Sequence, residues 1–329
     1  MQTGSLVTLS LISLLFLAGC ESADRPPLSG DIRQADLKDH IYRLADPGLE
    51  GRLAGTKSEA RAANYIADHF REFELEPGGE EDIYFQFFPL AGPMTQAMGV
   101  EGLLSRNVIG IIPGRADLTE FLIIGAHYDA QGMGGIISLG SESDPVVHPG
   151  ADDNASGTAG LLELARYFSA NRPTRTLVFI AFSGEELGLL GSRFFVENPT
   201  LPEGRILAMI NLDMIGRMEE VDLTISGTGS ADIWPEIISV SNRDSLNIRQ
   251  LASGSGASDH DSFYDEGIPA LHYFAGSHPD YHRPGDTAGK INYEKTAMIV
   301  SHVKRVIAHL DTTAAEELIF EPAGYRTTD

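Results

Sequence analysis

The chain has 329 residues, of which 42% are hydrophobic and 22% charged, as in a soluble globular protein long enough to bury a sizeable core. Its 47 acidic and 24 basic residues give a formal net charge of -23, which argues against nucleic acid or anionic lipid as the main partner. The single cysteine, Cys20, excludes an internal disulfide.

The N-terminus differs in composition from the rest of the chain. Residues 6–18, LVTLSLISLLFLA, form an apolar segment too short to cross a bilayer comfortably, as is typical of a secretory signal. The LAGC that ends at Cys20 resembles the bacterial lipoprotein signal, which is cleaved before a cysteine that becomes acylated, although no Lys or Arg precedes the apolar segment. We therefore predict a signal peptide at 1–19, and a lipidated cysteine with a linker at 20–34. Acyl chains would hold the exported protein on a membrane surface of the cell envelope, and Glu21 favours the outer membrane, facing the periplasm or the exterior.

Helical and strand patterns alternate along the rest of the chain. Apolar residues recur at helical spacing in six segments: 35–46, 57–73, 155–170, 188–197, 230–242 and 292–310. Continuous apolar runs mark four strands: 120–126, 176–182, 206–212 and 268–274. Because buried strands separated by amphipathic helices form parallel sheets covered on both faces, we predict a three-layer α/β/α sandwich with a mainly parallel, mixed central sheet. Without an internal repeat or a second linker, we expect a single domain at 35–312 and a C-terminal tail at 313–329.

Histidine and acidic residues follow all four predicted strands. The strands lead into His127-Tyr128-Asp129, Gly184-Glu185-Glu186, Asp213, and a loop that ends in Asp280-Tyr281-His282. A further acidic segment, GADDNASG at 150–157, leads into the third predicted helix. Taken singly, these residues are ordinary helix caps, hydrogen-bonded histidines or solvated turns. Together they lie at the carboxyl edge of the sheet, where open α/β proteins place their functional sites.

Several carboxylates at one sheet edge need a countercharge. Without one they repel each other and take up protons, because buried charges must be paired or bound to metal. Since the chain has no usable thiolate at this edge, its His, Asp and Glu side chains suit zinc in an open, catalytic site. Two Zn²⁺ ions would be balanced by three carboxylate ligands and one hydroxide, so the sequence predicts two zinc ions.

The order of the motifs resembles that of a known family. His-x-Asp at 127–129 is followed by GADDNASG, SGEELGLLGS, NLDMIG, SDHDSF and DYHRPGDT. This order resembles the secreted zinc aminopeptidases with co-catalytic metals, whose relatives include glutamate carboxypeptidase II and glutaminyl cyclase. The similarity extends from about residue 35 to 310, and LEGRLAGTKSEARAANYIADHF also resembles the family's opening helix.

The resemblance implies five metal ligands. One zinc would be bound by His127 and Asp213, the other by Glu186 and His282, and Asp153 would bridge both. The family's pattern places the bridge at the fourth residue of GADDNASG, which is Asp153 and not Asp152. It also implies a cis peptide bond between Asp153 and Asn154.

The remaining roles implied by the resemblance concern proton transfer and orientation. Glu185 would act as general base by taking a proton from the water held between the metals, which leaves a bridging hydroxide, and would later pass that proton to the leaving amine. Tyr281 would donate a hydrogen bond to the developing oxyanion, unless it only packs against the site. Three carboxylates would lie around the ligands: Asp129 accepting a hydrogen bond from His127, Asp259 behind the site, and Asp286 either orienting the loop around His282 or serving as a turn residue.

The function that the resemblance implies is removal of N-terminal residues from peptides, with the substrate ammonium held by Glu185 and Asp213. A carboxypeptidase or dipeptidase is the first alternative and would need an arginine for a carboxylate, for which Arg217 and Arg283 are near in sequence. The second alternative, a non-catalytic binding relative, would have lost ligands or the base, and this chain keeps all of them. Oligomeric state and side-chain preference leave no pattern in the sequence.

Overall fold

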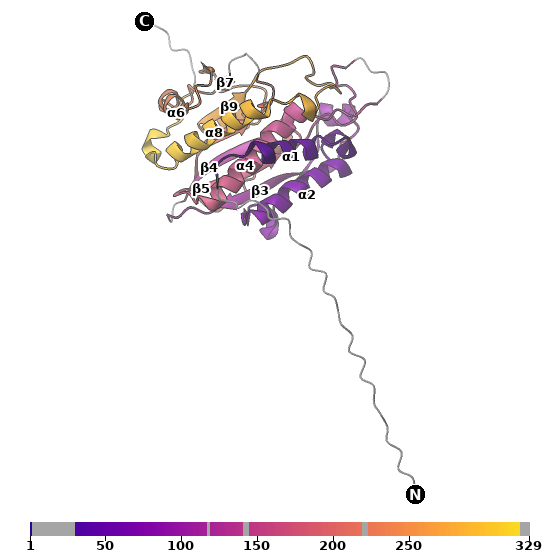
Figure 1. Ribbon diagram of the computed structural model, residues 1–329, viewed down its shortest axis with the longest axis horizontal. Helices are drawn as coiled ribbons and strands as arrows, with labels where there is room; N and C mark the ends of the chain where they lie inside the picture. The colour runs from indigo at the N-terminus through magenta and orange to yellow at the C-terminus, as the bar shows by residue number, and fades with distance from the viewer. Residues whose placement is uncertain (2–29, 117–118, 141–144, 219–222, 323–329) are drawn as a thin grey trace.

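A computed structural model describes Met1 and residues 30–116, 119–140, 145–218 and 223–322 (Figure 1). The predicted signal peptide, the lipidation site Cys20 and most of the linker at 20–34 lie outside the described residues, as does the end of the tail at 313–329. Within the described part of the chain, no helix combines the length and the apolar character that crossing a bilayer requires.

The described strands form one mixed sheet with the order β1-β3-β5-β4-β6-β9-β7-β8, and β2 pairs with β3. The strands are β1 Glu76–Pro77, β2 Phe85–Pro89, β3 Leu104–Ile112, β4 Glu120–His127, β5 Thr176–Phe182, β6 Arg205–Leu212, β7 Leu223–Ser226, β8 Ile248–Leu251 and β9 Ala270–Phe274. The four strands predicted from the sequence, β4, β5, β6 and β9, are adjacent and parallel at the centre. Antiparallel pairs extend the sheet on both sides: β3 with β1, β2 and β5, and β7 with β9.

Helices cover both faces of the sheet, which confirms the predicted single-domain α/β/α class. The helices are α1 Gln34–Leu44, α2 Lys57–Glu72, α3 Pro93–Ala97, α4 Gly157–Ala170, α5 Leu190–Glu197, α6 Trp234–Ser241, α7 His260–Asp265 and α8 Tyr293–Leu310. In Figure 1, α1, α2, α4 and α8 lie on the near face, and their apolar residues share one core with that side of the sheet. Helices α5 and α7 cover the other face through Phe195 and Phe263.

The alternation of side chains explains why the central strands are apolar throughout. In β5, Leu177, Phe179 and Ala181 belong to the core beneath α1, α2, α4 and α8. The residues between them, including Val178 and Ile180, belong to the core beneath α5 and α7. Because both faces of the strand are buried, no polar position alternates with the apolar ones. The central strands therefore bring their carboxyl ends together at one firmly packed edge.

One buried carboxylate lies in this core outside the strand-end cluster. Glu59, in the first turn of α2, accepts hydrogen bonds on Oε1 from the hydroxyl of Tyr128 and from Ser105 Oγ at 3.2 Å. Its Oε2 lies 3.8 Å from Arg106 Nε. Burial raises the pKa of Glu59 to about 7, against the opposing effects of Tyr128 and Arg106.

Glu59→Gln is expected to weaken the dependence of stability on pH. Because the folded pKa of about 7 lies above the ordinary value of 4.5, the contribution of Glu59 is most favourable below pH 4.5 and is lost as the pH rises through 7. This loss amounts to about 3 kcal/mol of unfolding free energy, and the variant should not show it. Urea unfolding of wild type and variant at pH 5 and pH 8, both with a metal chelator present, measures the difference. The exposed Glu203→Gln is the control, and an equal change in stability between the two pH values in wild type and Glu59→Gln would contradict the prediction.

Candidate metal centre

The predicted site residues meet at the carboxyl edge of the sheet. His127 is the last residue of β4, Glu185 and Glu186 follow β5, and Asp213 immediately follows β6. Asp153 lies in the short π-helical segment η3, Ala151–Ser156, before α4, and His282 lies in the loop between β9 and α8. The Asp153–Asn154 peptide bond is cis, as predicted. The side chains form two groups whose potential ligand atoms lie within 4.8 Å of one another: His127, Glu185 and Asp213, and Asp153, Glu186 and His282.

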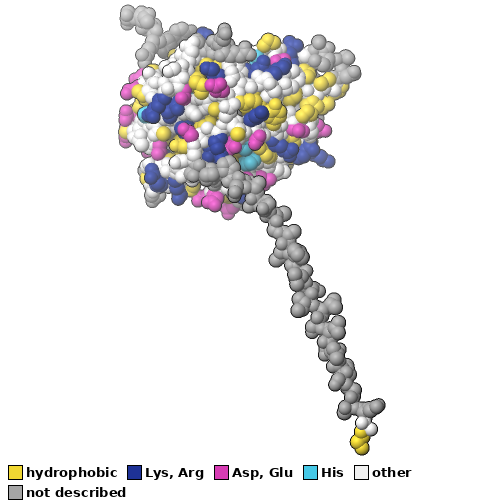
Figure 2. All heavy atoms as spheres, viewed as in Figure 1, with side chains coloured by type: hydrophobic (Ala, Val, Ile, Leu, Met, Phe, Trp, Pro, Cys, Tyr) yellow, Lys and Arg dark blue, Asp and Glu magenta, His cyan; other side chains and the backbone are white. Residues whose placement is uncertain are grey.

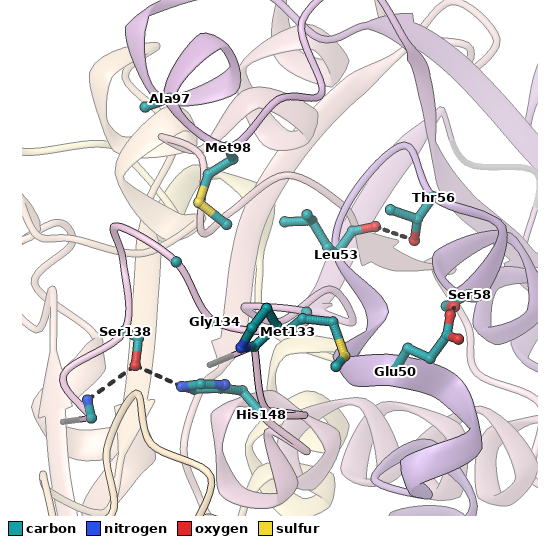
Figure 3. A pocket seen from close by; sticks show the side chains of 14 residues that line it. Glu50, Leu53, Thr56, Ser58, Ala97, Met98, Met133, Gly134, Ser138 and His148 are labelled. Carbon is teal, nitrogen blue, oxygen red and sulfur yellow. Dashed lines mark hydrogen bonds between the residues drawn. The ribbon is translucent and has the colours of Figure 1, made fainter. Parts of the chain in front are cut away.

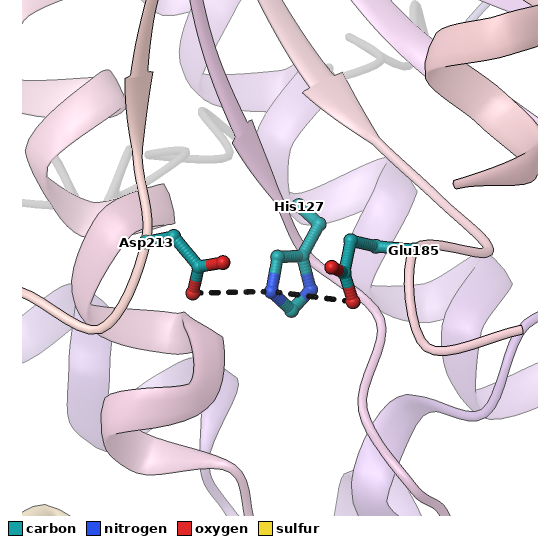
Figure 4. Close-up of side chains that lie close together, drawn as sticks. All are labelled: His127, Glu185 and Asp213. Atoms are coloured by element: carbon teal, nitrogen blue, oxygen red, sulfur yellow. Dashed lines mark ion pairs between the residues drawn. The ribbon is translucent and has the colours of Figure 1, made fainter. Parts of the chain in front are cut away.

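The first group is arranged around His127. Its Nε2 lies 3.4 Å from Asp213 Oδ1 and 3.9 Å from Glu185 Oε2, and Figure 4 shows the imidazole between these two carboxylates. On the other side of the ring, Nδ1 lies 3.2 Å from the backbone carbonyl oxygen of Asp129. This contact fixes the orientation in which Nε2 faces the acidic side chains.

The second group is joined to the first by Asp153. Asp153 Oδ1 lies 3.3 Å from His127 Nε2, and Oδ2 lies 3.2 Å from His282 Nε2. His282 Nε2 is also 3.2 Å from Glu186 Oε2, while its Nδ1 faces the carbonyl oxygen of Ile137 at 3.2 Å. One carboxylate therefore faces a histidine of each group, which is the arrangement expected of a bridging ligand. The alternative, Asp152, points elsewhere, because its Oδ1 accepts the backbone N–H of Gly216 at 2.6 Å.

The donor atoms fit bound cations. Among the described residues, His127 Nε2 and Asp213 Oδ1 are buried and have no hydrogen-bond partner. Buried polar atoms without partners are costly, and two of them aimed at the same acidic cluster indicate that something else binds there. Imidazole and carboxylate donors without a thiolate are a set that zinc accepts in catalytic sites.

The electrostatics of the bare cluster lead to the same conclusion. Burial raises the pKa of Glu186 well above its ordinary value, and the charges of Asp153 and Glu185 add to the effect. Burial also raises the pKa of Glu185, although His127 opposes the shift. Burial alone would lower the pKa of His127, but Glu185 and Asp213 outweigh it, and the pKa is raised well above its ordinary value. Protons thus balance the bare cluster, and divalent cations would displace them.

Of two predicted surrounding carboxylates, Asp129 makes a contact that differs from the one expected, and Asp286 binds backbone groups of the Asp153 segment. The Asp129 carboxylate lies 3.7 Å from His127 Nδ1, farther than the Asp129 carbonyl oxygen, and instead accepts the backbone N–H of Glu185 at 3.3 Å. The buried Asp286 carboxylate accepts the backbone N–H groups of Asp152 and Asp153, each at 3.0 Å. Asp286 therefore ties the loop that carries His282 to the segment that carries Asp153.

The other two predicted residues lie beside the cluster. Asp259 is fully buried, and burial raises its pKa to about 7. Tyr281 lines the same cleft as the ligands, with its ring centroid 3.9 Å from that of His282. Burial raises the pKa of Tyr281, with further contributions from Asp153 and Glu186, so its hydroxyl keeps its proton and can donate it in a hydrogen bond.

Two residues that contact the cluster were not identified from the sequence. Ser258 donates from Oγ to Asp213 Oδ2 at 2.7 Å, and Gln131 donates from Nε2 to Glu186 Oε1. Ser258 is next to Asp259 in the SDHDSF motif, which could have indicated it, whereas Gln131 lies in a loop without a distinguishing pattern. Outside the two ligand groups, His278 Nε2 lies 3.2 Å from Asp152 Oδ2.

A cleft of about 650 Å³ opens over the cluster. Beyond the acidic groups, its walls are mainly apolar, with contributions from Met94, Leu187, Leu189, Met214 and Phe274. Arg193 also lines this cleft, and no other Lys or Arg of the described residues does so. A cavity of this volume has room for a small part of a peptide beside the cluster.

A second cavity, of about 490 Å³, lies beside the loop that follows β4 and contains none of the clustered residues (Figure 3). Met98, Met133 and Leu53 line it together with Ser138 and His148. His148 Nε2 lies 2.7 Å from Ser138 Oγ and its Nδ1 lies 2.8 Å from the carbonyl oxygen of Val146. Both ring nitrogens therefore stabilise the loop itself.

An α/β/α fold with two adjoining groups of metal-binding side chains at its sheet edge defines a metal-dependent hydrolase. Residues 107–310 match Peptidase family M28, and the chain belongs to this family. A probable zinc metalloprotease of Pyrenophora tritici-repentis is 38% identical over 205 residues, which cover 61% of this chain and 46% of the relative. Aminopeptidase YwaD of Bacillus subtilis is 30% identical over 203 residues, covering 58% of this chain and 41% of the relative.

The chain thus spans less than half the length of these two relatives. The solved structure of BSAP, a zinc aminopeptidase from Bacillus subtilis, superimposes with a TM-score of 0.69 at 20% identity. The match covers 88% of this chain and 98% of that structure, and it confirms the fold.

Proposed function

We propose that this protein is a zinc-dependent exopeptidase that removes N-terminal residues from peptides, and that it uses two zinc ions. The observation that carries the proposal is the position of Asp153, whose carboxylate oxygens lie 3.3 Å from His127 Nε2 and 3.2 Å from His282 Nε2. Such a side chain joins two ligand groups into one centre. Membership of Peptidase family M28 and similarity to a protein called aminopeptidase YwaD support the proposed reaction.

The residues of the cluster divide into those that hold metal and one that moves a proton. In this proposal His127 and Asp213 would hold one zinc, Glu186 and His282 would hold the other, and Asp153 would be a ligand of both. The ions would lower the pKa of bound water and polarise the scissile carbonyl. His127, Asp213 and Asp153 would already supply three ligands to the first zinc. Glu185, which lies beside His127, would therefore be available for proton transfer.

Glu185 has the position and the proton affinity that a general base needs. The hydrogen bond from its backbone N–H to Asp129 holds it beside His127, and its side chain lines the cleft. Burial raises its pKa, so it can take the proton of the attacking water and then deliver it to the leaving amine. Tyr281, which keeps its own proton, would donate a hydrogen bond to the oxyanion that develops at the carbonyl.

The acidic cleft also suits the free amino group of a peptide. Asp153, Glu185, Glu186 and Asp213 all line it, and those not neutralised by metal would attract a substrate ammonium. Zinc analysis combined with hydrolysis of aminoacyl p-nitroanilides and N-blocked peptides tests the proposal. Two zinc ions per chain with cleavage only of free amino termini would support it, and cleavage restricted to blocked peptides would refute it.

One observation favours the alternative of a carboxypeptidase or dipeptidase. Arg217 forms an ion pair with Asp280 at 3.2 Å and lies outside the cleft, and Arg283 is exposed and also outside it. Arg193 instead lines the cleft, and among the described residues no carboxylate lies within ion-pairing distance of it. A substrate carboxylate, from a chain end or an acidic side chain, is the natural partner for this guanidinium.

Arg193→Gln is expected to raise KM for dipeptides with a free carboxylate by roughly tenfold, because a charge-assisted hydrogen bond contributes about 1.5–3 kcal/mol. Hydrolysis of aminoacyl p-nitroanilides, which carry no carboxylate, should change less than twofold. Initial rates on matched dipeptides and dipeptide amides measure the effect, with the exposed Arg283→Gln as control. If wild type cleaves only the free-carboxylate forms, the dipeptidase alternative replaces the aminopeptidase proposal.

We also propose that the protein is exported and anchored in the cell envelope through acyl chains on Cys20. This proposal rests on the LAGC pattern and on the apolar segment that precedes it. Fractionation of cells that express the full chain or Cys20→Ser tests it. Release of the variant from membranes would support the anchor, and equal membrane retention of both proteins would refute it.

A further inference from the structure

Arg52 is a fully buried arginine directly beside the candidate metal centre. It ends the short helical segment η1, Pro47–Arg52, and adopts a positive φ of 49°. Its guanidinium donates hydrogen bonds only to backbone carbonyl oxygens: from Nε to Tyr128 at 2.7 Å, from Nη1 to Pro149 at 2.7 Å and to Leu44, and from Nη2 to Gly150 at 3.0 Å.

Three of these four carbonyl groups belong to the segments that carry His127 and Asp153, and the fourth, that of Leu44, ends α1. Tyr128 lies between His127 and Asp129 at the end of β4, and Pro149 and Gly150 lead directly into η3, which carries Asp153. The backbone adds to the connection, because Gly132 N–H donates to the carbonyl oxygen of Gly51 at 2.9 Å. A single guanidinium therefore joins the end of β4 to the start of the Asp153 segment.

The charge of Arg52 has no direct carboxylate partner among the described residues. Every hydrogen bond of its guanidinium goes to a carbonyl oxygen, and it forms no ion pair within 4.0 Å. Burial lowers its pKa to about 10, and Asp129, Asp286 and Asp153 oppose this effect. The nearby carboxylates of Asp129, Asp286 and Asp153 thus stabilise the charge of Arg52. In return, the positive charge of Arg52 offsets part of the repulsion among these carboxylates.

We infer that Arg52 is a positioning residue that holds His127 and Asp153 at their observed separation, so that the centre is preorganised for zinc. The inference rests on the proposed zinc site. The planar guanidinium is essential to the role, because its N–H donors point in fixed directions and make four hydrogen bonds to carbonyl groups of three separate segments. A lysine would keep the charge but present a single nitrogen.

Arg52→Lys is therefore expected to weaken zinc binding by about 10–100-fold, the usual effect of removing a residue that orients metal ligands. Competition with a chromophoric chelator measures the zinc dissociation constants, and the absorption spectrum of the Co²⁺-substituted protein reports the ligand geometry. Arg166→Lys is the matched control, because Arg166 is equally buried but bonds to the Glu163 carboxylate on α4. This control should leave the zinc affinity and the cobalt spectrum unchanged.

Three results would overturn the inference: wild-type zinc affinity in Arg52→Lys, an unchanged cobalt spectrum, or an equal loss of affinity in Arg166→Lys. Failure of wild type to bind zinc would instead refute the proposed function. If Arg52→Lys does not fold, hydrogen exchange of wild type decides. Residues 127–132 and 148–153 should exchange at similar rates with and without zinc, and exchange that becomes more than tenfold faster on zinc removal would show that the metal, not Arg52, holds these segments.

Discussion

Replacement of Glu185 by glutamine is expected to reduce kcat by about 10²–10⁴-fold, the usual contribution of a general base, while both zinc ions remain bound. The amide has nearly the same shape as the carboxylate but cannot accept the proton of the attacking water. KM should change little, because the main loss is in the chemical step. Steady-state kinetics on an aminoacyl p-nitroanilide and zinc analysis of the same sample measure the two quantities.

Glu186→Gln is the matched variant for this experiment. Glu186 Oε2 lies 3.2 Å from His282 Nε2, and Gln131 donates a hydrogen bond to Oε1 of the same carboxylate. As a proposed ligand, it should lose zinc when the charge is removed. If Glu185→Gln loses metal and Glu186→Gln keeps it, the roles of the two neighbouring glutamates are reversed.

The two adjacent glutamates show how much of the site can be predicted from the sequence. Side chains of neighbouring residues after a strand point in different directions, so a sequence with Glu185-Glu186 at a strand end can serve two groups at once. The structure places Glu185 with His127 and Glu186 with His282.

The centre of the fold was predicted correctly because its strands are apolar on both faces. The strands on either side of this centre were not identified, since they lack this signal. In β3, the inward-facing Ser105 and Asn107 interrupt the apolar run, and they are accommodated by hydrogen bonds to Ser183 at 2.8 Å and to Gln86 at 2.9 Å. Such compensation depends on partners 78 and 21 residues away, which a local pattern does not contain.

The candidate site likewise combines residues that a local sequence pattern predicts with residues that depend on distant partners. Its proposed ligands lie at or after strand ends or just before a helix, so the parallel sheet alone brings them to one edge. Residues that orient them act through tertiary contacts that have no fixed spacing. Asp286 binds the backbone of Asp152 and Asp153, and Arg52 binds carbonyl groups of residues 128 and 149–150. Every residue has a backbone carbonyl group, so the sequence does not indicate which of them a side chain will bind. For this reason the sequence did not identify Arg52 as a residue that orients the ligands.

Removal of zinc from both sites is expected to abolish hydrolysis and to lower the unfolding temperature by about 16 °C at pH 8, and by less at pH 5. Zinc at about 1,000 times its Kd would stabilise the protein by about 4 kcal/mol per site, and each kcal/mol corresponds to roughly 2 °C for a domain of this size. Differential scanning calorimetry with zinc and with a chelator, at both pH values, measures the shift.

The pH dependence follows from the acidic cluster. In the metal-free protein burial raises the pKa of Glu185 and Glu186 above their unfolded values, so the folded state binds more protons and its stability falls as the pH rises above about 4.5. Zinc requires deprotonated ligands, so the bound form gains stability over the same range. Metal-free Glu186→Gln should therefore melt at a higher temperature than metal-free wild type at pH 8, because one of the buried carboxylates is gone. A difference between zinc-bound and metal-free protein that shrinks as the pH rises would mean that the cations do not relieve repulsion among these carboxylates.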